Sequence, residues 1–285
     1  MITRRTFLRG TAAGIAGAAV ASRLVVAEEG KPVPKIRVSS CSVGFDDAKK
    51  ADLEGVEVGV GGAAERLSIA DPKVREQHKA KMKETGLVIS SFMMGLFNSE
   101  PLASDPRGPA WLEQSIEAAK DLQAQVILIA FFGKGSLLEG RKVKTADVDV
   151  VVQRLKAAAP KAKEAGVILG IENTLDAKQN VEILDRIGSP AVQIYYDCYN
   201  LGISQGYDVP AEIRFLKDRI AIFHFKNGGD YLDNGKVKFE PVVEAMKEIG
   251  YKGWIVLETS HPSKDRVADT KRNADYVRKL FGVKV

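Results

Sequence analysis

Cysteine, histidine and long apolar runs are all scarce in this chain. Its 285 residues include two cysteines and three histidines. Two cysteines, Cys41 and Cys198, cannot build a disulfide framework for a chain of this length. No segment reaches the roughly 20 consecutive apolar residues that span a bilayer. The sequence therefore excludes a small disulfide-stapled protein and predicts no stable membrane anchor.

The first 27 residues have the pattern of a targeting segment. Arg4 and Arg5 precede Phe-Leu, a weakly apolar run rich in Gly and Ala covers residues 11–21, and Ala27 offers a small residue for cleavage. This pattern is typical of a twin-arginine export signal. The alternatives are a basic tail or a retained anchor, and the shortness of the apolar run argues against an anchor. We expect residues 1–27 to be removed and the mature protein to be periplasmic or otherwise exported.

The basic excess of the chain lies in this segment. The chain has 42 Lys and Arg against 37 Asp and Glu, and residues 1–27 hold four arginines and no acid. Without them, 38 basic residues face 37 acidic ones. A nearly neutral mature protein offers no electrostatic track for a nucleic acid, so we expect no nucleic-acid partner.

Eight short apolar runs, rich in β-branched residues, alternate with amphipathic segments over residues 28–285. The apolar runs are 36–41, 55–60, 88–94, 126–132, 167–173, 192–198, 220–227 and 253–259. Helical patterns include 71–85, 109–123, 146–165, 181–187, 240–249 and 265–281, and residues 42–54 leave room for about two helical turns. Eight such units predict a single α/β domain, a (β/α)8 TIM barrel with a parallel, eight-stranded, closed sheet.

Four consecutive predicted strands end in an acidic or imidazole side chain. These residues, which we call the strand-end cluster, are Glu172, Asp197, His224 and Glu258. All four can take the parity that points into the barrel, and neighbouring strands lie about 4.8 Å apart. The cluster is therefore predicted to converge near the barrel axis.

Three carboxylates and one imidazole suit a hard divalent cation such as Mn²⁺, Mg²⁺, Co²⁺ or Zn²⁺. Without a cation, the carboxylates would repel one another and some would take up protons. The alternative is that these charges pair inside the barrel, with Lys226 as the obvious competing partner. A single strand-end carboxylate would favour that alternative, but four in order on consecutive strands favour metal.

The residues from 167 to 258 resemble the xylose isomerase-like barrels, which include sugar isomerases and epimerases, inosose dehydratases and AP endonucleases. The motifs that carry the resemblance are Gly-Ile-Glu172-Asn173, Tyr-Asp197-Cys-Tyr-Asn200, Ile-Phe-His224-Phe-Lys226-Asn227 and Gly250-Tyr-Lys-Gly-Trp-Ile-Val-Leu-Glu258. The resemblance implies that the strand-end cluster binds one divalent ion and that Glu172 and Glu258 are catalytic, moving protons. The chain departs from the epimerases at Asn200, where they often carry a histidine that touches the substrate.

The resulting hypothesis is a metal-dependent sugar isomerase or epimerase. It would act on a small carbohydrate, a keto- or aldo-sugar or related polyol, by proton transfer through a metal-bound enediolate. Four residues are candidates for substrate binding: Lys226, Asn200, Glu57 and His261. Three of these residues also have an alternative interpretation without a substrate. Lys226 could form a salt bridge to a ligand carboxylate, Glu57 could pair with a lysine inside the barrel, and His261 could be a solvated loop residue. The protein could also be a homo-oligomer.

Three other functions compete with this hypothesis. A dehydratase or lyase acting on a keto-sugar or keto-glycoside would use the same site and begin with the same proton removal. An AP endonuclease would need three zinc ions and many histidines, whereas this chain has only His78, His224 and His261. A non-catalytic sugar-binding protein would retain the metal without turnover.

Overall fold

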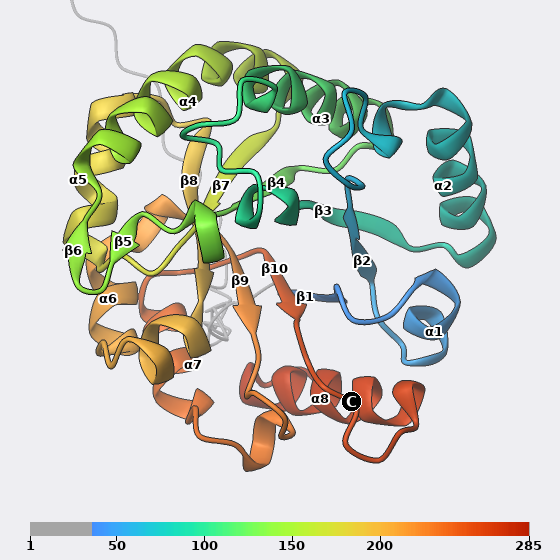
Figure 1. The fold of residues 1–285 in the computed structure, drawn as a ribbon. Helices are drawn as coiled ribbons and strands as arrows, with labels where there is room; N and C mark the ends of the chain where they lie inside the picture. Colours follow the sequence, from blue (N-terminus) through green and yellow to red (C-terminus); the bar gives the residue numbers. More distant parts are fainter. Residues whose placement is uncertain (1–35, 285) are drawn as a thin grey trace, which may run out of the picture. The chain divides into compact units, whose positions relative to one another are not determined.

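Eight parallel strands close into a barrel in the computed structural model, which describes residues 36–284 (Figure 1). The strand order around the barrel is β1-β10-β9-β8-β7-β4-β3-β2. The strands are β1 (Arg37–Ser40), β2 (Gly55–Gly59), β3 (Val88–Met94), β4 (Val126–Ala130), β7 (Ile168–Glu172), β8 (Val192–Asp197), β9 (Ile220–Phe225) and β10 (Trp254–Leu257). The predicted (β/α)8 barrel and all eight predicted strands are confirmed, whereas the predicted signal at residues 1–27 lies outside the described residues.

Alternation along the strands separates two apolar regions. In β4, Leu128 and Ala130 join the cluster inside the barrel, whereas Ile127 and Ile129 join the larger core under the helices. Successive side chains of a strand point to opposite faces, so this parity follows from the pleat. The same parity turns Cys198, the residue after β8, into the outer core, where it is fully buried.

Eight α-helices of the described residues cover the barrel. They are α1 (Phe45–Lys50), α2 (Pro72–Thr85), α3 (Gly108–Leu122), α4 (Thr145–Ala165), α5 (Ala177–Ile187), α6 (Val209–Leu216), α7 (Phe239–Glu248) and α8 (Arg266–Leu280). Gly86 and Gly166 end α2 and α4 in the left-handed conformation, at φ 76° and 71°, as the sequence predicts. None of the described helices has both the length and the apolar character needed to cross a membrane.

Helix α5 begins four residues earlier than the apolar pattern predicts. The side chain of Asp176 accepts a hydrogen bond from Gln179 N, and the Gln179 side chain accepts one from Asp176 N. This capping box satisfies two backbone donors of the first turn, so the helix starts at a polar segment that the apolar pattern does not mark.

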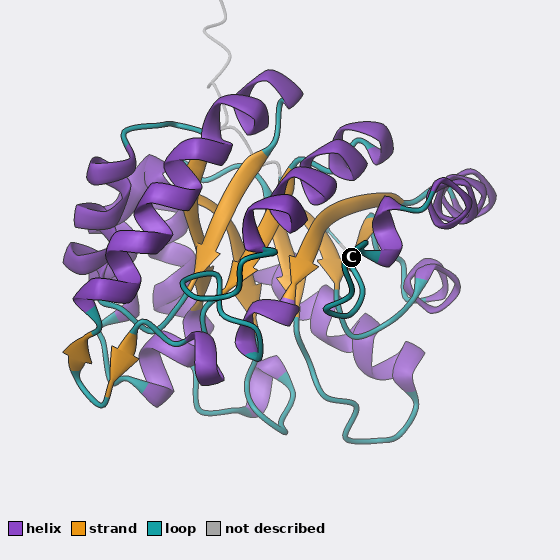
Figure 2. Cartoon of the chain, turned by 45° about the horizontal axis from the view of Figure 1, so that its top comes forward, coloured by secondary structure: helices purple, strands orange, loops and turns teal. Residues whose placement is uncertain are grey.

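The irregular segments gather on the side where the strands end. A two-stranded hairpin, β5 (Leu138–Glu139) and β6 (Lys142–Val143), follows β4, and a π-helical turn, Asn200–Ser204, follows β8. Figure 2 shows the arrowheads of the barrel strands pointing toward the same edge, where these connections lie. The carboxyl ends of barrel strands are where enzymes of this fold build their sites.

Candidate metal centre

The strand-end cluster is assembled by four neighbouring strands. Glu172 and Asp197 are the last residues of β7 and β8, His224 lies in β9, and Glu258 directly follows β10. Asp197 and His224 are paired in register. One ligand atom from each of the four residues lies within 4.8 Å of all the others. The structure thus brings the four predicted ligands together, as the parity of the strands requires.

The imidazole of His224 lies at the centre of the cluster. Its Nδ1 atom is 3.1 Å from Glu172 Oε1, 3.4 Å from Glu258 Oε2 and 4.0 Å from Asp197 Oδ2. The side chains of His224, Asp197 and Glu172 are at most 6% exposed, whereas that of Glu258 is 40% exposed. The cluster is therefore closed below and open at Glu258, which is the side from which a small molecule can reach it.

Lys226 shares the inward parity of His224 and joins the cluster. Its Nζ donates a hydrogen bond to Glu258 Oε2 at 2.9 Å and lies 3.1 Å from Asp197 Oδ2. Burial disfavours the ammonium, but Asp197 and Glu258 outweigh burial and raise the pKa of Lys226. The lysine is thus the counter-ion of two carboxylates in this structure, as the alternative interpretation of Lys226 predicts.

Crowding of acids perturbs the carboxylates of the cluster. Burial, reinforced by Asp197 and Glu258, raises the pKa of Glu172 to about 7, against the opposing effect of His224. Burial also raises the pKa of Asp197, although Lys226 and His224 oppose it. Both shifts agree with the expectation that, without a cation, some carboxylates of the cluster take up protons.

The donor set fits a divalent cation. Asp197 Oδ1 accepts a hydrogen bond from Asn200 N at 2.7 Å, which orients the carboxylate, while the buried Asp197 Oδ2 has the Lys226 ammonium 3.1 Å away as its counter-ion. A buried carboxylate oxygen needs a cation beside it, a role that Lys226 fills here and that a divalent ion can share. With two further carboxylates and an imidazole nitrogen at the same point, the residues suit Mn²⁺, Zn²⁺, Mg²⁺ or Co²⁺.

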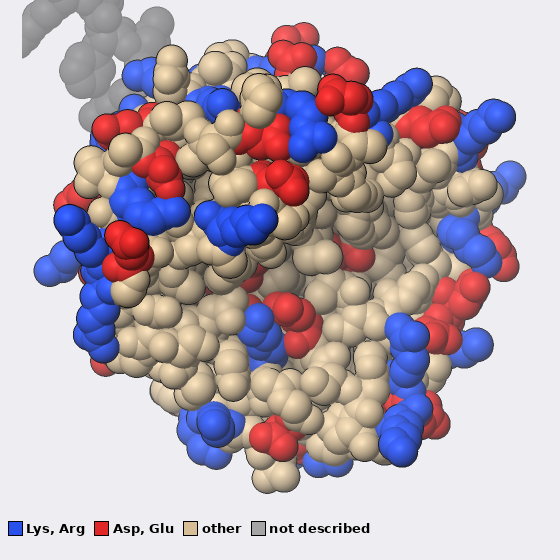
Figure 3. All heavy atoms as spheres, viewed as in Figure 1, with Lys and Arg blue, Asp and Glu red and all other residues tan. Residues whose placement is uncertain are grey.

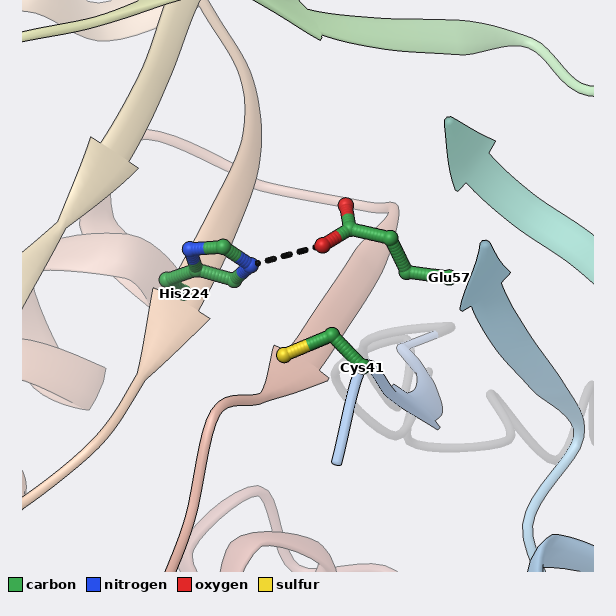
Figure 4. A group of neighbouring side chains, drawn as sticks. All are labelled: Cys41, Glu57 and His224. Atoms are coloured by element: carbon green, nitrogen blue, oxygen red, sulfur yellow. Dashed lines mark hydrogen bonds and ion pairs between the residues drawn. The ribbon is translucent and has the colours of Figure 1, made fainter. Parts of the chain in front are cut away.

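Glu57, on β2, lies on the other side of His224. Its Oε1 is 3.2 Å from His224 Nε2, and its Oε2 accepts hydrogen bonds from Ser91 Oγ at 2.6 Å and Tyr195 OH at 2.7 Å. The Glu57 side chain is fully buried, and its partner is the imidazole of His224 and not the lysine that the sequence allows. Its role in binding a substrate hydroxyl stays a prediction. Figure 4 shows Glu57 and Cys41 approaching the same edge of the imidazole.

Sequence reasoning missed Ser91 and Tyr195 as partners of Glu57. Tyr195 precedes Asp197 by two residues and therefore shares its inward parity, and Ser91 is paired with Glu57 in the register of β2 and β3. Strand parity was thus a usable signal for Tyr195, provided that the barrel is known to be closed.

The other two substrate-binding candidates differ in their contacts. Asn200 contacts it through the backbone N–H that Asp197 accepts. His261 is half-buried and its Nε2 lies 3.4 Å from Thr270 Oγ1 of α8. Their contact with a substrate stays a prediction. Figure 3 shows this face of the molecule hollowed at its centre, with basic and acidic side chains in the hollow and mostly uncharged residues around it.

Comparison with known proteins assigns this architecture to a described family and identifies relatives. A family model described as a xylose isomerase-like TIM barrel matches residues 45–280. The SgbU protein of Escherichia coli (strain K12), provisionally named an L-ribulose-5-phosphate 3-epimerase, is 26% identical over 242 residues, which cover 74% of this chain and 80% of SgbU.

Solved structures share the fold at lower identity. A structure of L-ribulose 3-epimerase superposes with a TM-score of 0.71 at 18% identity, covering 88% of this chain and 95% of that one. The apo form of 3-keto-D-glucoside 4-epimerase, YcjR, from E. coli gives a TM-score of 0.69 at 16% identity, covering 86% and 99% of the two chains.

Proposed function

The chain belongs to the xylose isomerase-like TIM barrel family, and from this premise we propose that it is a metal-dependent isomerase or epimerase of a sugar or related polyol. The observation that carries the proposal is the convergence of the strand-end cluster at the open end of the barrel. The names of the relatives support the reaction class, since SgbU and the two structural neighbours named above are described as sugar epimerases.

The four residues of the strand-end cluster would hold the ion, which when bound polarises a carbonyl and makes the adjacent C–H more acidic. The chain's own residues then move the proton. Glu172 and Glu258 both place a carboxylate oxygen beside His224, at 3.1 and 3.4 Å from its Nδ1 atom, and Glu258 is the more exposed of the two. We propose that one of them removes the proton from the carbon beside the carbonyl and that the other returns it.

Lys226 has two tasks in this scheme. Its ammonium pairs with the neighbouring carboxylates of Asp197 and Glu258, and it would supply a positive charge beside the oxygen on which charge develops. The side chains of Glu258 and Lys226 are 40% and 18% exposed, so a sugar can reach both groups. The substrate would be a small carbohydrate.

Exchange of a carbon-bound hydrogen with solvent tests the proposal. The purified chain is loaded in turn with Mn²⁺, Zn²⁺, Mg²⁺ and Co²⁺ and incubated in D₂O with ketopentoses, ketohexoses and 3-keto-glycosides, and deuterium beside the carbonyl is measured by NMR. We expect exchange and a new epimer or isomer, reduced at least about 1,000-fold in Glu172→Gln, because the amide cannot accept the proton.

Other outcomes contradict the proposal in distinguishable ways. An absorbing enone in place of an epimer would identify a dehydratase or lyase. Metal binding without exchange on any of these sugars would identify a binding protein. Exchange that is unchanged in Glu172→Gln would remove Glu172 from the mechanism.

We also propose that the protein is exported by its twin-arginine segment. The support is the Arg4-Arg5 pair with the Gly- and Ala-rich run after it. Replacing both arginines with lysine should retain the precursor in the cytoplasm, as fractionation and immunoblotting can measure. Periplasmic protein in unchanged amount would contradict export by this route.

A further inference from the structure

We infer that Glu57 is a positioning residue that fixes which nitrogen of His224 faces the strand-end cluster. The inference rests on the proposed metal centre and assigns a role to a residue outside the four ligands. A histidine can bind a cation only through an unprotonated nitrogen, and the hydrogen bond of the other nitrogen decides which one that is.

The two edges of the His224 imidazole have different surroundings. Nδ1 faces three carboxylates of the strand-end cluster, with Glu172 Oε1 closest at 3.1 Å. Nε2 faces Glu57 Oε1 at 3.2 Å, a contact that Figure 4 shows reaching across from β2 to β9. Carboxylates lie on both edges of the ring. The proton of the neutral imidazole is therefore held by the nitrogen whose neighbouring carboxylate most requires a hydrogen-bond donor.

Glu57 is held as an acceptor. Both Ser91 Oγ and Tyr195 OH donate to its Oε2 atom, at 2.6 and 2.7 Å, and its side chain is fully buried. Ser91 and Tyr195 stabilise the ionised carboxylate, and burial leaves no room for water to replace the imidazole as the partner of Oε1. The remaining lone pairs of Glu57 therefore require the N–H of His224 Nε2.

Tyr195 also restrains the ring itself. Its aromatic ring lies 4.5 Å from the imidazole of His224, centroid to centroid, at an interplanar angle of 57°. The ring cannot turn over without displacing this contact and the Glu57 hydrogen bond. Once Nε2 carries the proton, the lone pair of Nδ1 points at the three carboxylates, which is the arrangement a cation needs.

A cation on the opposite edge is the competing arrangement. Cys41 Sγ, a Glu57 oxygen and His224 Nε2 also lie within 4.8 Å of one another. Glu57 Oε2 is already bound by two hydroxyl groups, and Cys41 Sγ lies 3.6 Å from Leu257 O, to which it donates. On the Nδ1 edge, in contrast, three carboxylates converge, and the Lys226 ammonium is the counter-ion of Asp197 and Glu258. The geometry therefore favours the ion on the Nδ1 edge.

The substitution Glu57→Gln tests this role while preserving shape. Ser91 and Tyr195 both donate, so the Gln oxygen turns toward them and its NH₂ group faces His224. An NH₂ group requires an acceptor, so Nε2 loses its proton and Nδ1 gains one, toward the cluster. We expect the dissociation constant for Zn²⁺ to rise about 10- to 100-fold, the usual effect of removing the carboxylate behind a ligating histidine.

Nitrogen NMR of the Zn²⁺-loaded protein provides a readout independent of turnover. The chain has only three histidines, so ¹⁵N-histidine labelling gives a spectrum that single substitutions can assign. We expect His224 to show a slowly exchanging proton on Nε2 in the wild type and to lose it in Glu57→Gln. Calorimetry with Zn²⁺ alone measures the affinity, and thermal unfolding confirms that the variant is folded.

Glu212→Gln is a matched control. Glu212, on α6, accepts a hydrogen bond at 2.9 Å from the OH group of Tyr196, which lies on β8 next to Tyr195 and points to the outer side of the barrel. The same chemical change is therefore made away from the imidazole. Zn²⁺ affinity and the His224 signals should not change.

Tyr195→Phe is used if Glu57→Gln does not fold. It removes one hydrogen-bond donor from Glu57 and should weaken Zn²⁺ binding by less than about tenfold. The NMR signal of the proton on His224 Nε2 should shift.

Three results would overturn the inference. Zn²⁺ affinity and the Nε2 proton could both be unchanged in Glu57→Gln, or in Tyr195→Phe if that variant is used. Co²⁺ could give a sulfur-to-metal charge-transfer band that disappears in Cys41→Ser, which would place the ion on the Nε2 edge. A wild-type protein that binds none of Zn²⁺, Mn²⁺, Mg²⁺ and Co²⁺ would overturn the metal centre itself, and with it the proposed reaction and the role of Glu57.

Discussion

The two halves of the barrel mouth differ in chemistry. Strands β7, β8, β9 and β10 carry the strand-end cluster together with Lys226. At the inner side of β1, β3 and β4 lie Cys41, Met93 and Phe132, which are partly buried and uncharged. A reaction that develops charge on one part of a sugar needs charged groups there and an uncharged wall for the rest. In the proposed reaction, one half of this barrel would perform the chemistry and the other half would line the space for the substrate.

Glu57 is the exception that links the halves. It lies on β2, in the uncharged half, but its contacts are with Tyr195 of β8 and His224 of β9. Its carboxylate is fully buried, so it contacts the charged half through His224 and not through the solvent-exposed side of the cluster. Three substitutions would break or sharpen the division between the halves.

The largest effect is expected from Asp197→Asn in the charged half. The amide keeps the shape of the side chain but removes the charge and one oxygen from a buried ligand position, so metal affinity should fall at least about 100-fold and turnover with it. Metal analysis after gel filtration and the deuterium-exchange assay measure both. Asp176→Asn, which alters the cap of α5 instead, should keep the metal. A metal-replete, active Asp197→Asn protein would show that the cluster is not the centre.

An intermediate effect is expected from Lys226→Met. The variant loses the ammonium between Asp197 and Glu258, so the metal-free protein should lose about 1–3 kcal/mol of unfolding free energy. The loss should shrink when Zn²⁺ or Mn²⁺ is saturating, because the ion replaces the missing positive charge. Urea unfolding with chelator and with metal measures the two values. Equal losses in both conditions would mean that lysine and metal do not share these carboxylates.

The smallest effect on metal binding is expected from Phe132→Leu in the uncharged half. The side chain stays apolar and no ligand changes, so Zn²⁺ affinity should remain within about twofold of the wild type. The KM for the sugar should rise a few-fold as the wall loses an aromatic surface. Calorimetry and steady-state kinetics separate the two quantities. A large loss of metal affinity would abolish the distinction between the halves.

The sequence predicts the charged half better than the uncharged one. Each of four consecutive strands has one inward ligand, so parity alone predicts that these ligands converge. Lys226 is predictable as a competing partner of the carboxylates because it lies two residues after His224. Two of the three partners of Glu57, Tyr195 and His224, are harder to predict, since they lie 138 and 167 residues away and meet it across the barrel axis. No local pattern encodes a contact between strands that are not neighbours, and the register shift between Val56 and Glu57 further obscures it.

Local polar chemistry accounts for the remaining differences. The capping box at Asp176 extends α5 beyond its apolar stripe, and the β5–β6 hairpin is only two residues long on each strand. Such short elements carry too few apolar residues to show a period of their own.

The ammonium of Lys226 should allow the protein to fold before a metal is loaded. Small zinc domains unfold when their ion is withdrawn, because nothing else balances their ligands. Here a covalently attached cation already lies against two of the carboxylates. Treatment with a chelator should therefore yield a folded, inactive protein that regains activity on remetallation, and the same protein could acquire different ions according to the compartment that supplies them.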